Sequence, residues 1–149
     1  MFRRFGFISV LVFMLSLSQL AYASDDITVY KSPSCGCCNK WIKHLEENGF
    51  KVNGVDVDNV IPYKIKYGLT PQLASCHTAM IDGYTIEGHV PAKDIRRLLK
   101  EKPDLVGLSV PQMPVGTPGM EQGNRKDPYK VIGWDKTGKE SVFTDYQKY

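Results

Sequence analysis

The chain has 149 residues, of which 42% are hydrophobic and 23% charged, and a formal net charge of +3. This length suits one domain with a single core and leaves little room for two. Residues 1–23 contribute two of the positive charges and no negative charge, so the rest of the chain carries +1. So small a charge excludes the basic surface that nucleic-acid binding requires.

Residues 1–23 have the features of a secretory signal peptide. Two arginines precede an uncharged apolar run at residues 7–17, and the segment ends with the small residues of a cleavage site, Ala-Tyr-Ala. The run of 11 residues is far shorter than the roughly 20 that a membrane-spanning helix needs. We therefore predict cleavage before Ser24, export to the periplasm, and no membrane contact for the mature domain, residues 24–149.

The first elements of this domain are predicted to be a strand and a helix. The β-branched and aromatic run at residues 27–30 predicts a strand that ends in a Ser-Pro-Ser turn. After the turn, apolar residues recur at spacings of three and four and predict an amphipathic helix over residues 35–48. We expect Ser34 to cap its N-terminus and Gly49 to follow its C-terminus.

A second strand and a short helix are predicted next. Residues 50–57 have strand composition, with an interruption expected at Asn53-Gly54. Pro62 and Gly68 then bracket a short helix, since proline is favoured in the first turn and glycine just beyond the last.

The following segment predicts a hairpin and a third helix. Residues 78–81 and 84–86 flank Asp82-Gly83, which is a strong hairpin signal, and Pro91 opens an amphipathic helix. The order β-α-β-α-β-β-α is that of a thioredoxin-like fold of the α/β class.

The rest of the chain is predicted to add a loop and a hairpin to this fold. Residues 103–128 contain five prolines and four glycines, so no regular element is expected there. The chain then ends in two short strands around a turn at residues 135–138, which predict an added C-terminal β-hairpin.

All four cysteines of the chain, Cys35, Cys37, Cys38 and Cys76, lie in the predicted mature domain. An even number of cysteines in an exported protein commonly forms structural disulfides. Three of these cysteines lie within four residues, whereas stabilising disulfides close longer loops. The spacing therefore favours a redox or metal site. A binding module whose fold is stabilised by disulfides is the third candidate function.

Cys35 and Cys38 form the C-x-x-C pattern of thiol–disulfide exchange. The pattern follows a strand and opens a helix, where the free N–H groups and the helix dipole favour a thiolate. An oxidoreductase that uses Cys35 and Cys38 is therefore the alternative function. Cys37 departs from that pattern, because it adds a soft ligand that simple thiol exchange does not need.

Cys76 is expected to complete a four-sulfur metal site. The predicted topology places the loop before residue 78 opposite the helix N-terminus, so four sulfurs should converge there. Thiolates select copper(I), zinc or iron–sulfur clusters, and zinc prefers two well-spaced pairs of cysteines. Adjacent side chains such as Cys37 and Cys38 cannot both aim at one ion. We therefore predict several copper(I) ions bridged by thiolates.

The sequence around these cysteines resembles that of a known family. The matching positions are residues 29–38, Trp41, His44, Leu45, Gly49 and Phe50, and the segments 73–79, 84–92 and 111–121. The resemblance is to the CopG-type bacterial copper-resistance proteins and covers nearly the whole mature chain. It implies a periplasmic, thioredoxin-like protein that binds copper at the cysteines and acts in copper tolerance by sequestration, transfer or copper redox.

Several other side chains also carry nitrogen or sulfur atoms that copper can bind. His77 adjoins Cys76, but neighbours in an extended chain point in opposite directions, so its role stays open. Met113 and Met120 lie in the irregular loop, where they either cap a copper(I) site or pack the loop onto the core. His44 and His89 are predicted to be structural or surface groups.

The expected partners are therefore copper ions and other periplasmic copper-handling proteins. The sequence favours a metal-binding protein, and the second candidate is an oxidoreductase that acts on copper or on thiols.

Overall fold

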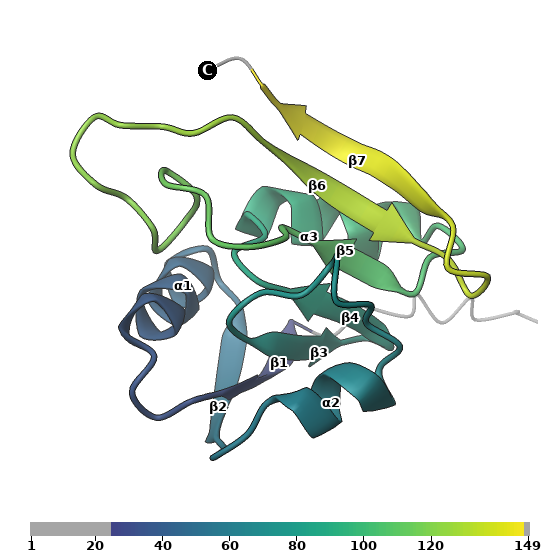
Figure 1. Ribbon diagram of the computed structural model, residues 1–149, viewed down its shortest axis with the longest axis horizontal. Coiled ribbons are helices and arrows are strands. Elements are labelled where there is room, and N and C mark those ends of the chain that lie inside the picture. The colour runs from purple at the N-terminus through teal and green to yellow at the C-terminus, as the bar shows by residue number, and fades with distance from the viewer. Residues whose placement is uncertain (1–24, 148–149) are drawn as a thin grey trace, which may run out of the picture.

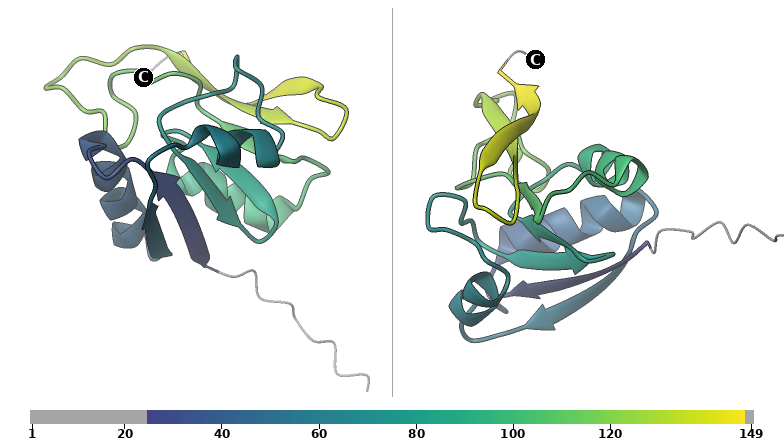
Figure 2. Two further views of the ribbon diagram at one scale, coloured as in Figure 1. Left: turned by 60° about the horizontal axis from the view of Figure 1, so that its bottom comes forward. Right: turned by 90° about the vertical axis from the view of Figure 1, so that its right-hand side faces the viewer.

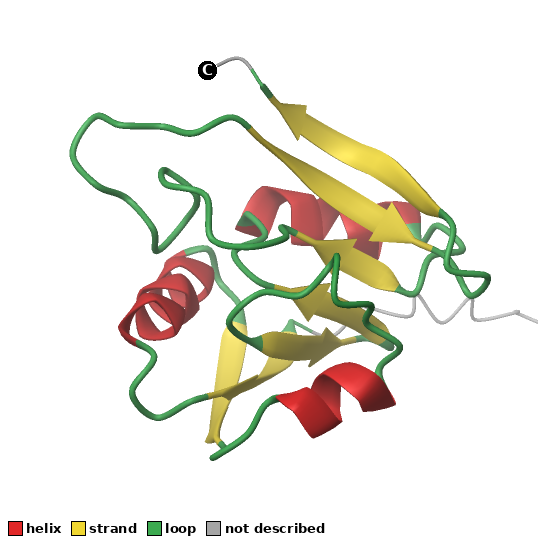
Figure 3. Cartoon of the chain, viewed as in Figure 1, coloured by secondary structure: helices red, strands yellow, loops and turns green. Residues whose placement is uncertain are grey.

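The computed structural model describes residues 25–147 as one mixed sheet with three helices (Figures 1 and 3). The predicted signal peptide lies outside these residues. The elements are β1 (Asp26–Lys31), α1 (Gly36–Glu47), β2 (Lys51–Asp56), α2 (Ile61–Lys66), β3 (Thr78–Ile81), β4 (Tyr84–Glu87), α3 (Ala92–Glu101), β5 (Gly107–Ser109), β6 (Tyr129–Trp134) and β7 (Glu140–Tyr146). None of the helices in this part of the chain has the length and apolar character needed to cross a membrane.

The sheet has seven strands in the order β2-β1-β3-β4-β5-β6-β7. β1 and β2 are parallel and are joined through α1, whereas β3 is antiparallel to both β1 and β4. The predicted thioredoxin-like order of elements is confirmed. The C-terminal hairpin of β6 and β7 is also confirmed, and it pairs with β5, so that it extends the same sheet.

The main core lies between the sheet and two of the helices. α1 and α3 cover one face of the sheet, and α2 lies on the other (Figure 2). Trp41 and Leu45 of α1 and Ile95 and Leu98 of α3 are fully buried against the strands. Each such side chain contributes about 1.5–3 kcal/mol by leaving water. This packing fixes the first turn of α1, which carries three of the cysteines, against the sheet.

Two local predictions in the N-terminal half were wrong. Cys35, not Ser34, is the N-cap of α1, and the Ser34 hydroxyl lies 3.0 Å from that of Ser32 within the preceding turn. β2 also runs without a break through Asn53-Gly54. There, Gly54 pairs with Val29 in the parallel ladder, so pairing with β1 overrides the local turn preference.

The prediction that residues 103–128 hold no regular element was also wrong. The three-residue strand β5 lies there, parallel to β4 and antiparallel to β6. Gly107 lies so close to the carbonyl of Thr85 that any side chain would collide with it. The glycine that weakens strand propensity in the sequence is therefore the residue that allows this close pairing.

Candidate metal centre

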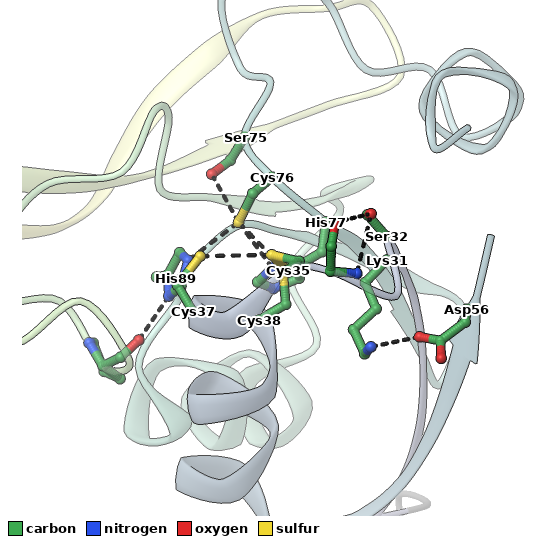
Figure 4. The surroundings of a disulfide bond; sticks show 12 residues. Lys31, Ser32, Cys35, Cys37, Cys38, Asp56, Ser75, Cys76, His77 and His89 are labelled. Atoms are coloured by element: carbon green, nitrogen blue, oxygen red, sulfur yellow. Dashed lines mark hydrogen bonds and ion pairs between the residues drawn. A yellow bond between two sulfur atoms is a disulfide. The ribbon is translucent and has the colours of Figure 1, made fainter. Parts of the chain in front are cut away.

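Three of the cysteines lie at the start of α1, immediately after the turn that follows β1 (Figure 4). Cys38 points into the core and is fully buried, whereas Cys35 and Cys37 are half-buried. Cys35 and Cys38 form a disulfide in this structure, and Cys37 and Cys76 are free thiols. In the first turn of α1, Cys38 therefore lies in the core, whereas Cys35 and Cys37 lie closer to the surface.

Cys76 lies in the loop before β3, and a buried ion pair holds this loop in place. The Glu87 carboxylate accepts hydrogen bonds from the backbone N–H of Ser75 at 2.6 Å, from the Thr78 hydroxyl at 2.7 Å, and from Lys64. Lys64 and Glu87 are almost fully buried, with side-chain exposures of 7% and 0%. The residue next to Cys76 is therefore anchored by a charge in the protein interior.

The same loop is also tied to the segment after β5. The Ser109 hydroxyl donates to the carbonyl of Leu73 at 2.6 Å, and the N–H of Gln112 donates to the carbonyl of Ala74 at 3.2 Å. The Ser75 hydroxyl donates to the carbonyl of Gln112. Hydrogen bonds of Leu73, Ala74 and Ser75 therefore hold the segment that leads into Cys76.

The loop between β5 and β6, which is rich in proline and glycine, packs against the start of α1. Gly119 has φ +86°, and a Cβ there would lie 2.8 Å from the N of Trp41 and 2.9 Å from the O of Cys37. Only glycine fits both the left-handed backbone and this contact. The loop consequently lies against the first turn of α1.

The four cysteine sulfurs converge, as the sequence predicts. They all lie within 4.8 Å of one another. Besides the disulfide between Cys35 and Cys38, the sulfurs of Cys35 and Cys37 lie 3.5 Å apart and those of Cys38 and Cys76 lie 3.6 Å apart. With metal–sulfur bonds of about 2.3 Å, two sulfurs on one ion are at most about 4.6 Å apart. These two non-bonded separations are therefore compatible with shared metal ions once the disulfide is reduced.

Two buried imidazoles face the sulfur of Cys76. The Nδ1 of His77 and the Nε2 of His89 each lie 3.2 Å from Cys76 Sγ, and both rings are fully buried. His77 packs on the indole of Trp41, with ring centroids 4.3 Å apart. These three residues form a second group whose ligand atoms lie within 4.8 Å of one another.

Burial also sets the protonation of these groups. It raises the pKa of the Cys76 thiol to about 12, with a further contribution from the nearby Cys37. It lowers the pKa of His89, and lowers that of His77 well below its ordinary value. Both imidazoles are therefore neutral at pH 7, which is the form that binds metals.

The prediction that His89 is a surface group was wrong, and the hairpin shows how it could have been found. The Asp82-Gly83 turn sets a register in which Thr78 pairs with Glu87. Continued by two residues, the same register places Cys76 opposite His89. His77 is also buried, and its Nδ1 lies 3.2 Å from the Cys76 sulfur, so it faces the sulfurs; its role as a ligand stays a prediction.

The remaining candidate ligands are His44, Met113 and Met120. The Nε2 of His44 accepts a hydrogen bond from the N–H of Ala92 at 3.1 Å, so His44 has the structural role that was predicted. Met113 is 47% exposed, and Met120 is half-buried next to Gly119. A ligand role for the two methionines stays a prediction.

Comparison with known proteins identifies close relatives. The family model described as "Protein of unknown function, DUF411" matches residues 73–120. No curated protein matches the chain. The solved structure "Copper resistance protein copG- Form 2" is 50% identical and has a TM-score of 0.78, with 81% of this chain and 97% of that chain covered. "Copper resistance protein copG- Form 1" is 47% identical and has a TM-score of 0.80, with 85% and 100% covered.

Proposed function

The chain belongs to the CopG copper-resistance family, and from this premise we propose that it is a periplasmic copper(I)-binding protein that acts in copper tolerance. The observation that carries the proposal is the convergence of four cysteine sulfurs within 4.8 Å. Thiolates are the preferred ligands of copper(I). Copper is the cargo of this site, held by Cys35, Cys37, Cys38 and Cys76.

The arrangement of the sulfurs favours a cluster over a single ion. One close pair, Cys35 and Cys37, lies at the edge of the site, and the other, Cys38 and Cys76, reaches toward the core. Cys37 and Cys38 are neighbours in the first turn of α1, and Cys38 is buried while Cys37 is half-buried, so their sulfurs are not aimed at one point and a single ion would leave a sulfur unused. Because a thiolate can bridge two copper(I) ions, several ions of low coordination number satisfy all four sulfurs.

The thiol chemistry of the site supports the alternative function. Cys35 and Cys38 form a disulfide at the start of α1, where a thiolate is favoured in thiol–disulfide exchange. The same disulfide removes two of the four sulfurs from metal binding. Copper loading and thiol oxidation therefore compete for the same atoms, and an oxidised protein must be reduced before it binds a cluster.

The proposal is tested by titrating copper(I) into the fully reduced mature chain under anaerobic conditions, against a competing chelator. We expect more than one copper(I) per chain and a short copper–copper distance in X-ray absorption. Cys76→Ser and Cys37→Ser should each lower the stoichiometry. A single ion at saturation without metal–metal scattering would contradict the cluster. Rapid insulin reduction by the metal-free protein would favour the oxidoreductase alternative.

A further inference from the structure

The short helix α2 carries an exposed apolar face. Its Ile61 and Ile65 are 52% and 72% exposed, and residues four apart in a helix lie on the same side of it. The other large hydrophobic side chains that are exposed in the described part of the chain, Met113 and Val142, lie outside α2. Exposed apolar residues are normal when they are scattered, whereas neighbouring ones often mark an interaction site. This face of α2 is therefore a candidate interface.

A groove of about 360 Å³ lies beside this face. It is lined by apolar residues of α2 and of the loop that follows, which are Ile61, Ile65, Leu69, Pro71 and Ala74. Lys64 also lines the groove, but its side chain is only 7% exposed and its charge is paired with Glu87. The surface therefore combines an apolar recess with an apolar projection, the side chain of Ile65.

A recess and a projection on one surface fit a second copy of the same surface. In a two-fold dimer every contact occurs twice, so Ile65 of each copy can enter the groove of the other. We infer that two copies of this chain associate through α2, with the two helices antiparallel and each Ile65 packed in the groove of the other copy.

The charges at the two ends of α2 favour the antiparallel arrangement. Asp58 precedes the helix and Lys66 ends it, and both are exposed. Lys66 lies over the ring of Tyr67, and neither Asp58 nor Lys66 belongs to an ion pair within residues 25–147. Antiparallel helices place each Lys66 near the Asp58 of the other copy, whereas parallel helices place like charges together. The net charge of +1 outside residues 1–23 also keeps the repulsion between two copies small.

The interface lies away from α1 and its three cysteines. α2 is on the face of the sheet opposite to α1 and α3, so a second copy on α2 leaves α1 uncovered (Figure 2). The groove reaches the loop of Cys76 only through Pro71 and Ala74, which precede it. The dimer therefore needs no metal and leaves the start of α1 open.

The test measures the average mass of the reduced mature chain by sedimentation equilibrium in the presence of a chelator. Because α2 has only six residues, the interface is small, and small interfaces form weak complexes. We therefore expect the mass to rise from that of a monomer toward that of a dimer as the concentration increases to about 1 mM.

Two substitutions of exposed residues show whether α2 forms the interface. Ile65→Asp should weaken association by about tenfold or more, because it places a charge in the apolar groove of the other copy. Since Ile65 is 72% exposed, the variant should keep the fold of the monomer. Val142→Asp is the matched control, because Val142 is 52% exposed on β7, and it should leave association unchanged.

Charge reversal tests the orientation of the two helices. Asp58→Lys and Lys66→Asp should each weaken association, and the two together should restore it, since opposite charges then face each other again. Carbodiimide cross-linking of mixed unlabelled and ¹⁵N-labelled chains should join Lys66 of one copy to Asp58 of the other. A mass that stays that of the monomer up to about 1 mM would overturn the proposal and leave this face to a different partner. A dimer that persists unchanged in Ile65→Asp would overturn it as well, and failure of the double reversal to restore association would overturn the antiparallel arrangement.

Discussion

The replacement Glu87→Gln tests how the buried ion pair supports the metal centre. The substitution keeps the shape of the side chain but removes the charge that faces Lys64, which is only 7% exposed. Removing one partner of a buried pair costs about 3–5 kcal/mol, because the other charge is left in the interior without compensation. We take about 3 kcal/mol for this variant, since the amide oxygen of glutamine still accepts one of the hydrogen bonds from Ser75 and Thr78.

The free energy of unfolding of the mature chain is measured by urea denaturation. Glu47→Gln is the matched control, because its partner Lys43 lies 3.7 Å away and both side chains are exposed. Such a pair contributes about 0.3–0.5 kcal/mol. Adding Lys64→Met to Glu87→Gln should recover part of the loss, since it removes the unpaired charge. If Glu87→Gln destabilises no more than Glu47→Gln, the ion pair does not anchor the loop and the reasoning is wrong.

Three further predictions concern the closing loop, the protonation of the site and processing. Gly119→Ala should destabilise the protein by at least about 1–2 kcal/mol, the cost of a left-handed backbone, and more through its collision with α1. Gly36→Ala, which meets no atom within 4 Å, should be neutral or slightly stabilising in the same denaturation experiment. Because burial is the main cause that raises the pKa of Cys76, its alkylation in a Cys37→Ser variant with the Cys35–Cys38 disulfide intact should still accelerate about tenfold per pH unit as the pH passes 9.0, without a plateau there. A raised pKa in the folded state also means that this thiol's contribution to stability is complete below pH 9 and is lost as the pH rises from 9 to 12. Mass spectrometry of the exported protein should give Ser24 as its first residue, and an intact precursor in the membrane fraction would contradict that prediction.

The sequence was sufficient for the parts of the fold that local signals control. The Asp82-Gly83 turn, the apolar face of α1 and the proline that opens α2 each predict their element, and the order of elements then predicts the topology. β5 could not be predicted in this way. Its three residues acquire strand geometry only because β4 and β6 present backbone donors and acceptors on either side of them.

The site was predictable as far as its cysteines, and less so for its histidines. The spacing of Cys35, Cys37 and Cys38 is visible in the sequence, and the position of Cys76 follows from the topology. The burial of His89 depends on the register of a hairpin and on a contact with Pro118, 29 residues away. A single histidine between β4 and α3 carries no periodic pattern, so its burial depends on tertiary contacts alone.

The pairing of β1 with β3 also has a consequence for the order in which the protein assembles. Cys35, Cys37 and Cys38 are neighbours even in an unfolded chain, whereas Cys76, 38 residues beyond Cys38, joins them only when β3 has docked beside β1. If the site binds copper(I) as proposed, three of its sulfurs are available to the metal before the chain has folded. Closure of the sheet then adds the fourth sulfur, so the folded chain should bind the ions more tightly than the unfolded chain does. A ligand that binds the folded chain more tightly than the unfolded chain raises the free energy of unfolding. Bound copper should therefore stabilise the fold of the protein.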